Sequence, residues 1–231
     1  SIKTSTTVAA FVNGITGHAH ECDDADLPVV IHPSIVTLPA IFALGQQMEA
    51  SGKDILEAYI IGWEVIGAIG RMFQPAHIER GWHPTATIGT FGAAAASAKI
   101  LDLNKDQTLM ALGIASSGAA GIKLQDGTMS KPLHAGNAAR NGAYAALLAR
   151  DGFTAAPNIL EAKAGFAEVY NGAGTYDLSQ VSKLGNPYTL VDPGPLIKKY
   201  ACTATFQVTI ETIQELAIRE SISPDNIESV K

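Results

Sequence analysis

The sequence predicts a mainly α-helical protein, and three observations support this fold class. Apolar residues recur at spacings of three and four, long stretches rich in alanine and glycine carry almost no charge, and helix-capping residues stand where helices should begin and end. With 231 residues, 47% of them hydrophobic, the chain can bury a substantial core as one large domain or two small ones. Disorder is therefore not expected over most of its length.

The helices of the first half can be justified in order. Apolar residues over 55–66 form one stripe at helical spacing, and small residues on this stripe would let another helix approach closely. Residues 88–100 are almost uncharged but fall short of the roughly 20 apolar residues that a membrane span needs, so we expect a buried helix. Asn104, with Gln107 three residues later, resembles a capping box that begins a helix running toward Ala115.

The second half is less regular. A helix is expected over about 137–150, stopping at Gly152, because glycine readily adopts the left-handed conformation that follows many helices. Between 172 and 194, glycine and proline recur too often for one regular element, and we place a candidate domain boundary there. Beyond it, apolar spacing predicts a helix over 208–217, and residues 227–231 are expected to begin a strand.

Charge and cysteine content narrow the function classes. The net charge of −6 and the pI near 5.5 provide no basic surface, which disfavours nucleic acid and anionic membranes as partners. Cys22 and Cys202 lack the spacing of a disulfide scaffold or a CxxC motif, and two thiolates are too few for an iron–sulfur cluster. The first residues form no signal-peptide pattern. We therefore expect a cytoplasmic protein without a cofactor.

One segment places cations inside this apolar chain. Lys131 and His134 stand between Gly127 and Gly136 in an alanine-rich neighbourhood. An ammonium group is costly to bury unless a carboxylate meets it, so we expect Lys131 to bind an anionic substrate. The two glycines would let the backbone approach that ligand closely. Alternatively, Lys131 could snorkel to water or pair with an internal aspartate, and His134 could only hold the loop.

Two histidines stand directly before prolines, His32 before Pro33 and His83 before Pro84. Proline biases the preceding residue toward extended geometry, which would hold each ring at the end of a loop and suits a proton donor or acceptor. Alternatively, His32 could only cap the helix that follows. His77 lies in a polar segment, and we expect it at the surface.

Residues 18–24 concentrate two imidazoles and three carboxylates in seven residues. This density is typical of a metal site or of a network that organises proton transfer, and the spacing alone does not choose between them. A solvated acidic turn is a third possibility. If the segment binds a metal, the ligands would be His18, His20, Asp23 and Asp24.

Several of these segments resemble the MmgE/PrpD family, which includes methylcitrate dehydratase, cis-aconitate decarboxylase and iminodisuccinate epimerase. The resemblance is carried by Phe-Val-Asn-Gly at 11–14, by 18–24, by Gly-Trp-His-Pro-Thr at 81–85 and by 127–136. It implies an all-helical domain over 1–185, without its N-terminal part, and the beginning of a smaller α+β lid domain over 186–231. It also implies a homodimer, and a chain that is part of a longer protein.

The resemblance implies roles for the candidate residues. His32 and His83 would transfer protons, with no choice of which is the acid and which the base. Lys131 and Lys198 would bind substrate carboxylates and stabilise the developing negative charge. Lys198 is identified by its segment, 198–202, which is similar to a family pattern Lys-x-Tyr-Pro-Cys.

The acidic segment supplies the remaining roles. Glu21 and Asp24 would orient a histidine and set its tautomer, while Asp23 and His134 would contact the substrate. The chain departs from the family pattern at four positions, where Glu21 replaces Asp, Ala25 replaces Thr or Ser, Ala201 replaces Pro and Gln207 replaces His.

The function implied by the resemblance is that of a cofactor-independent lyase. We expect a dehydratase that acts on a small di- or tricarboxylate, such as a 2-methylcitrate-like substrate, through a carbanion. Epimerisation and decarboxylation need the same groups and are the alternatives within the family. The loop 127–136 is closer to epimerase-like members than to methylcitrate dehydratases. Outside these reactions, the alternatives are a metal-binding helical protein and a non-catalytic partial member of the family.

Overall fold

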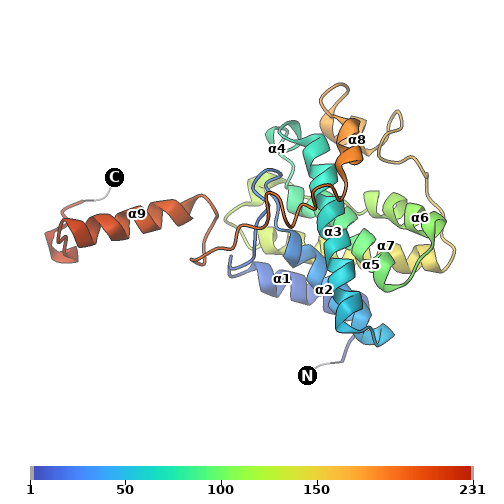
Figure 1. Cartoon of the computed structure of the whole chain (residues 1–231), viewed down its shortest axis with the longest axis horizontal. Helices are drawn as coiled ribbons and strands as arrows, with labels where there is room; N and C mark the ends of the chain where they lie inside the picture. The colour runs from blue at the N-terminus through green and yellow to red at the C-terminus, as the bar shows by residue number, and fades with distance from the viewer. Residues whose placement is uncertain (1–2, 230–231) are drawn as a thin grey trace.

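The computed structural model describes residues 3–229, and it is mainly α-helical, as predicted (Figure 1). The α-helices are α1 (Thr6–His18), α2 (Pro33–Met48), α3 (Gly52–Phe73), α4 (Ala76–Glu79), α5 (Pro84–Ile100), α6 (Lys105–Ser116), α7 (Ser130–Arg150), α8 (Phe166–Asn171) and α9 (Phe206–Arg219). Three short 3₁₀ helices are η1 (Lys123–Gln125), η2 (Leu178–Lys183) and η3 (Pro224–Asn226).

Helix α5 lies at the centre of the fold. Every residue of α5 except Lys99 is buried, and the helix packs against α2, α3, α6 and α7. This confirms the buried helix expected over 88–100, although it begins four residues earlier, at Pro84. The earlier start follows from the proline, whose fixed φ suits the first turn of a helix and whose missing N–H is not needed there.

Glycine lets these helices approach closely. A Cβ atom added to Gly142 in α7 would lie 2.5 Å from Ala93 Cβ and 2.6 Å from the backbone nitrogen of Ala94 in α5. Gly136 was expected to let the backbone approach a ligand, but in the structure it lies against α1 instead. Its added Cβ would lie 2.5 Å from the carbonyl oxygen of Phe11, so Gly136 lets α7 pack against α1.

Two predicted helix boundaries can be compared with the structure. The capping box is confirmed, because Asn104 Oδ1 accepts from Gln107 N at 2.9 Å and α6 follows directly. Helix α7 ends at Arg150 before Gly152, whose φ is +91°, but it begins at Ser130 rather than near 137. The extension places Lys131 and His134 three residues apart on one helix, so their side chains share a face.

The C-terminal part differs from the expectation of a β-containing lid. The helix expected over 208–217 is confirmed as α9, which projects away from the helical body (Figure 1) and buries only Gln207. In the described residues, β structure is limited to isolated bridges. Residues 227–229 are not a strand, because no other strand lies beside them to pair with their backbone groups, and 230–231 lie outside the described residues.

The remaining expectations for the whole chain stay open. The division into domains at 185/186, the homodimer and the cytoplasmic location stay predictions. Within residues 3–229, the helices are too short or too polar for any of them to cross a membrane.

We expect Gly142→Ala to destabilise the fold by about 1–3 kcal/mol, because the new methyl group would press on the backbone of α5. Gly52→Ala is the matched control, since an added Cβ there meets no atom within 4 Å, and it should be neutral or stabilising by up to about 1 kcal/mol. Urea unfolding of both variants measures the difference. Equal stability of the two variants would contradict the close α5–α7 contact.

Candidate active site

Polar side chains from six parts of the chain meet in one place. They come from the end of α1, the loop after it, the start of α2, the starts of α5 and α7, and the segment before α9. Ring centroids join the histidines in series, with His18 4.9 Å from His32 and 6.4 Å from His83, and His83 5.1 Å from His134. We call this set the His–Lys cluster: His18, Glu21, Asp23, His32, His83, Lys131, His134 and Lys198.

The two lysines of the cluster share one carboxylate. Lys131 Nζ forms an ion pair with Glu21 Oε1, and Lys198 Nζ lies 3.1 Å from Glu21 Oε2 and 3.4 Å from Asp23 Oδ1. The side chain of Lys198 is 0% exposed, so these carboxylates replace the water that its ammonium group has lost. Burial alone would raise the pKa of Glu21, but hydrogen bonds and charges from Lys131 and Lys198 lower it.

Asp23 orients His18. The two residues are joined by a bond of 2.7 Å between His18 Nδ1 and Asp23 Oδ2. Burial would raise the pKa of Asp23, but the contact with His18 and the nearby charges outweigh it and lower the pKa to about 2. Because an ionised carboxylate only accepts, Nδ1 of His18 carries a proton. Its Nε2 is buried and has no hydrogen-bond partner within residues 3–229.

His32 is fixed as one tautomer. It is the N-cap of α2, directly before Pro33, and its Nδ1 lies 2.7 Å from the carbonyl oxygen of Asp24. A carbonyl oxygen can only accept, so Nδ1 donates and Nε2 keeps the lone pair. Burial lowers the pKa of His32 to about 4, despite the opposing charge of Asp23. At neutral pH this ring is therefore an uncharged base.

His83 and His134 contact each other through ring nitrogens. Their Nδ1 atoms lie 2.9 Å apart, so one ring donates and the other accepts. His83 is held at the N-cap of α5 before Pro84, and His134 lies one turn into α7. Burial first, and then the neighbouring His134, lower the pKa of His83 to about 2, while burial lowers that of His134. The pair is thus uncharged and suited to passing a proton.

The carboxylates of Glu21 and Asp24 were predicted to orient a histidine, but neither contacts one. The carboxylate of Asp24 accepts from the backbone nitrogen of Ser34 at 3.2 Å and from the Ser34 hydroxyl, so it caps the first turn of α2. Only the backbone oxygen of Asp24 contacts His32. Glu21 is bound to the two lysines instead of a histidine. Asp23, predicted to touch the substrate, provides the carboxylate that orients a ring.

His77 was predicted to lie at the surface, and this prediction is wrong, because the residue is 0% exposed. Its Nδ1 lies 2.9 Å from Asn171 Oδ1 and its Nε2 2.7 Å from Thr87 Oγ1. Burial lowers its pKa to about 4. Glu79 and Arg80, which follow it in sequence, are exposed, while the ring of His77 is buried.

The four metal ligands suggested by the sequence are not brought together. His20 is exposed and the carboxylate of Asp24 is bound to Ser34. The side chains of His18, Asp23 and His32 do have ligand atoms within 4.8 Å of one another. However, the His32 nitrogen that lies 3.5 Å from Asp23 Oδ2 is Nδ1, and it donates to the carbonyl oxygen of Asp24. A cation would also lie beside the buried ammonium of Lys198, so this donor set favours proton transfer over a metal.

Sequence reasoning assigned His18 no individual catalytic role, although its segment was a candidate for a proton-transfer network. Its only signal was membership of the acidic segment, where it stands five residues before Asp23. The sequence also did not reveal the use of Gln207, where the family pattern has a histidine. Gln207 Oε1 accepts from the backbone nitrogens of Lys199 and Tyr200 at 3.0 and 2.9 Å, and so shapes the turn directly after Lys198.

Known proteins match this chain over most of its length. The sequence profile of the MmgE/PrpD N-terminal domain matches residues 1–179. The cis-aconitate decarboxylase of Homo sapiens is 38% identical over 174 residues, which are 73% of this chain and 36% of that protein. The cis-aconitate decarboxylase of Aspergillus terreus is 31% identical over 247 aligned positions, covering 99% of this chain and 49% of that protein. The chain thus spans from about a third to about half of the length of these relatives.

We expect the chain to lose stability as the pH falls from about 6.5 to about 4. Burial lowers the pKa of His32 and His77 to about 4 and that of His83 to about 2. In this window the unfolded chain binds more protons than the folded chain, so stability rises with pH. Each imidazole contributes on the order of 1–2 kcal/mol between pH 7 and 5. Asp26 has the opposite effect, because burial raises its pKa to about 6 and the folded chain then binds the extra proton. This single group offsets only part of the contribution of the three imidazoles.

Urea unfolding at pH 7 and pH 5 measures the effect. His83→Gln should reduce the difference between the free energies of unfolding at pH 7 and pH 5. His20→Gln, at an exposed position, should leave that difference unchanged. Equal free energies of unfolding at both pH values would contradict the buried, uncharged imidazoles.

Proposed function

The chain belongs to the MmgE/PrpD family, and from this premise we propose that it forms the helical part of a lyase that decarboxylates a small unsaturated tricarboxylate of the cis-aconitate type. From the sequence alone, dehydration is the first expectation and decarboxylation an alternative. The names of the relatives support the alternative. The observation that carries the proposal is the pair of lysines whose ammonium groups converge on one carboxylate beside four histidines.

Two ammonium groups suit a substrate with several carboxylates. Lys131 and Lys198 both contact Glu21, so a substrate carboxylate can take the same position between them. In the free protein Glu21 and Asp23 balance the two positive charges, and an entering anion is accommodated best if one of these carboxylates leaves. The side chain of Glu21 is 26% exposed and that of Asp23 only 5%. Glu21 is therefore the group that we expect the substrate to displace.

The chemistry requires stabilisation of a carbanion. Decarboxylation breaks the bond between a carboxylate and its neighbouring carbon, and the electron pair stays on that carbon. When the CO₂ leaves from the methylene arm of a cis-aconitate-type substrate, the resulting allylic carbanion extends to the carboxylate across the double bond. An ammonium group at that carboxylate stabilises the charge. Protonation of the far allylic carbon completes the reaction, with one CO₂ released and one proton taken up.

The proton donor must be charged while the substrate is bound. Burial keeps the imidazole of His83 uncharged in the free protein, since it lowers the pKa of this ring to about 2. The negative charge of a bound tricarboxylate acts in the opposite direction, because it favours the protonated ring. We assign the donor role to His83, which His134 can resupply across 2.9 Å. Such a donor contributes on the order of 10²–10⁴ in rate.

We expect Lys131→Met to weaken tricarboxylate binding and turnover about tenfold or more, because a hydrogen bond to a charged group contributes about 1.5–3 kcal/mol. Lys123→Met is the matched control, since Lys123 is an exposed lysine paired with Asp126 outside the cluster. Proton NMR of the chain with cis-aconitate in D₂O measures binding, loss of substrate and the identity of the product.

The product separates the reactions of the family. A decarboxylated product that carries deuterium from the solvent supports the proposal. Water addition or elimination, or exchange at one carbon without loss of CO₂, would replace it with dehydration or epimerisation. If Lys131→Met binds and converts the substrate as well as the wild type does, the proposed role of the lysine pair is contradicted. If the folded wild-type chain neither binds nor converts any tricarboxylate, the result supports a non-catalytic member of the family.

A further inference from the structure

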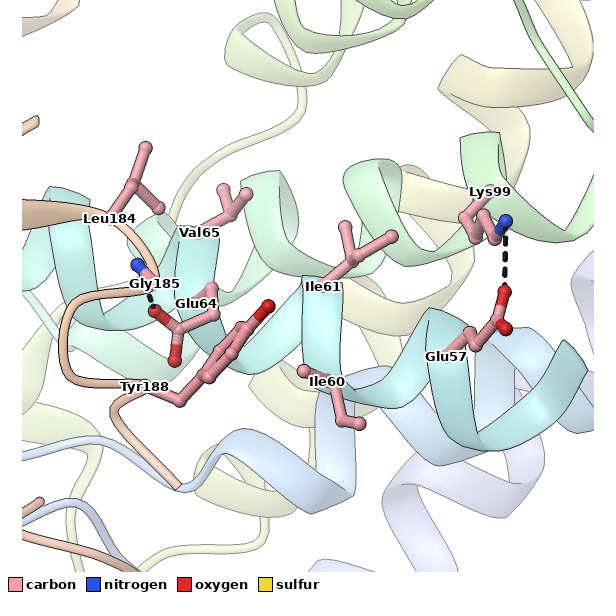
Figure 2. Close-up of a pocket in the computed structure, with 9 residues that line it drawn as sticks. All are labelled: Glu57, Ile60, Ile61, Glu64, Val65, Lys99, Leu184, Gly185 and Tyr188. Carbon is pink, nitrogen blue, oxygen red and sulfur yellow. Dashed lines mark hydrogen bonds and ion pairs between the residues drawn. The ribbon is translucent and has the colours of Figure 1, made fainter. Parts of the chain in front are cut away.

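The segment that carries Lys198 to the cluster is attached at both ends. We call residues 184–198 the crossing segment. It follows η2, lies along α3 at its beginning and reaches the loop after α1 at its end. Figure 2 shows the beginning, where Leu184, Gly185 and Tyr188 lie beside α3 and line an open pocket with Ile60 and Ile61.

The first attachment is a buried carboxylate of α3. Glu64 is 5% exposed, and its carboxylate accepts from the backbone nitrogen of Gly185 at 3.1 Å and from that of Thr189. The bond to Gly185 is drawn in Figure 2. An ionised acceptor makes stronger hydrogen bonds than a neutral one, and both amides belong to a segment that has no helix or strand to satisfy them.

Two further residues on the same face of α3, Gly67 and Arg71, contact the side chain of Thr189 or leave room for it. Both terminal nitrogens of Arg71 donate to Thr189 Oγ1 at 3.2 Å. A Cβ atom added to Gly67 would lie 2.6 Å from that oxygen, so only glycine leaves room for it. Positions 64, 67 and 71 are three and four residues apart and therefore share one helix face. This face is thus shaped around Thr189, which is 1% exposed.

The second attachment lies beside the cluster. Ala25 and Leu196 form an antiparallel bridge, with Ala25 N 3.0 Å from Leu196 O and Leu196 N 2.8 Å from Ala25 O. Ala25 stands two residues after Asp23, and Lys198 stands two residues after Leu196. The bridge therefore sets the register in which Lys198 meets Asp23.

We propose that Glu64 is a positioning residue for Lys198. Glu64 accepts from the amides of Gly185 and Thr189 and thereby fixes the crossing segment against α3. Because the segment is already ordered, burying Lys198 in the cluster costs less conformational entropy. The use of Lys198 as a carboxylate clamp rests on the proposed function. Its delivery by Glu64 is a separate claim that can be measured without turnover.

The test compares Glu64→Gln with Glu57→Gln in the 231-residue chain. Glutamine keeps the shape of Glu64 but replaces one carboxylate oxygen with an amide NH₂ group. This group cannot accept, so one of the two backbone N–H groups loses its partner. Glu57 lies on the same helix and pairs with Lys99 at 3.0 Å on the exposed surface (Figure 2). The measurement is the rate at which an amine-specific acylating reagent modifies Lys198, read by mass spectrometry against Lys199, whose side chain is 68% exposed.

We expect Glu64→Gln to raise the relative labelling of Lys198 by about tenfold, the effect of losing one hydrogen bond to a charged group, and Glu57→Gln to leave it unchanged. Labelling of Lys198 that stays at the wild-type level in folded Glu64→Gln overturns the proposal. So does an equal rise in Glu57→Gln. If Glu64→Gln fails to fold, Glu64→Asp keeps the charge but withdraws the carboxylate by one methylene group from the amides of Gly185 and Thr189. It should raise the labelling in the same direction, and an unchanged level in that variant then overturns the proposal.

The same experiment separates this inference from the proposed function. Adding cis-aconitate to the wild-type chain should protect Lys131 and Lys198 from the reagent if they bind carboxylates. A rise in labelling in Glu64→Gln, without protection by cis-aconitate in the wild type, supports the positioning role and contradicts the carboxylate clamp. Protection without the rise supports the clamp and contradicts the positioning role.

Discussion

The buried ammonium group of Lys198 is the constraint on which the site depends. An ammonium without water is tolerated only when carboxylates and hydrogen bonds replace its solvation, and Glu21 and Asp23 do this. The same two carboxylates contact Lys131 and His18. One short loop therefore ties together α1, α7 and the segment before α9. Removing either carboxylate would leave a buried charge uncompensated, which costs more than the pair itself contributes.

The helical body supplies the second condition, which is exclusion of water from the imidazoles. Close packing of α5 against α7, made possible by Gly142, places the first turns of both helices side by side, and this brings His83 and His134 into contact. Burial keeps these rings and His32 uncharged in the free protein. The site thus combines fixed positive charge on the lysines with neutral rings that an anionic ligand would make more basic.

Most of the helices and several site residues could be predicted because their signals are local. The uncharged, alanine-rich run locates α5 except for its first four residues, the capping box locates α6, and a lysine or histidine in an apolar, glycine-flanked segment indicates a polar site. What failed depended on contacts across the chain. Nothing near Asp24 reveals that its carboxylate would bind Ser34, and nothing near His77 reveals that it faces inward. A strand over 227–231 was predicted without its partner. The catalytic roles of the site residues stay proposals.

In our proposal, the position held by Glu21 between the two lysines is the binding position of a substrate carboxylate. A crystal structure of the chain with tricarballylate tests it most directly, because this saturated tricarboxylate lacks the double bond that the reaction needs. We predict a ligand carboxylate in contact with Lys131 and Lys198, and Glu21 moved away from at least one of them. A ligand bound elsewhere, with Glu21 still joined to both lysines, would contradict the account.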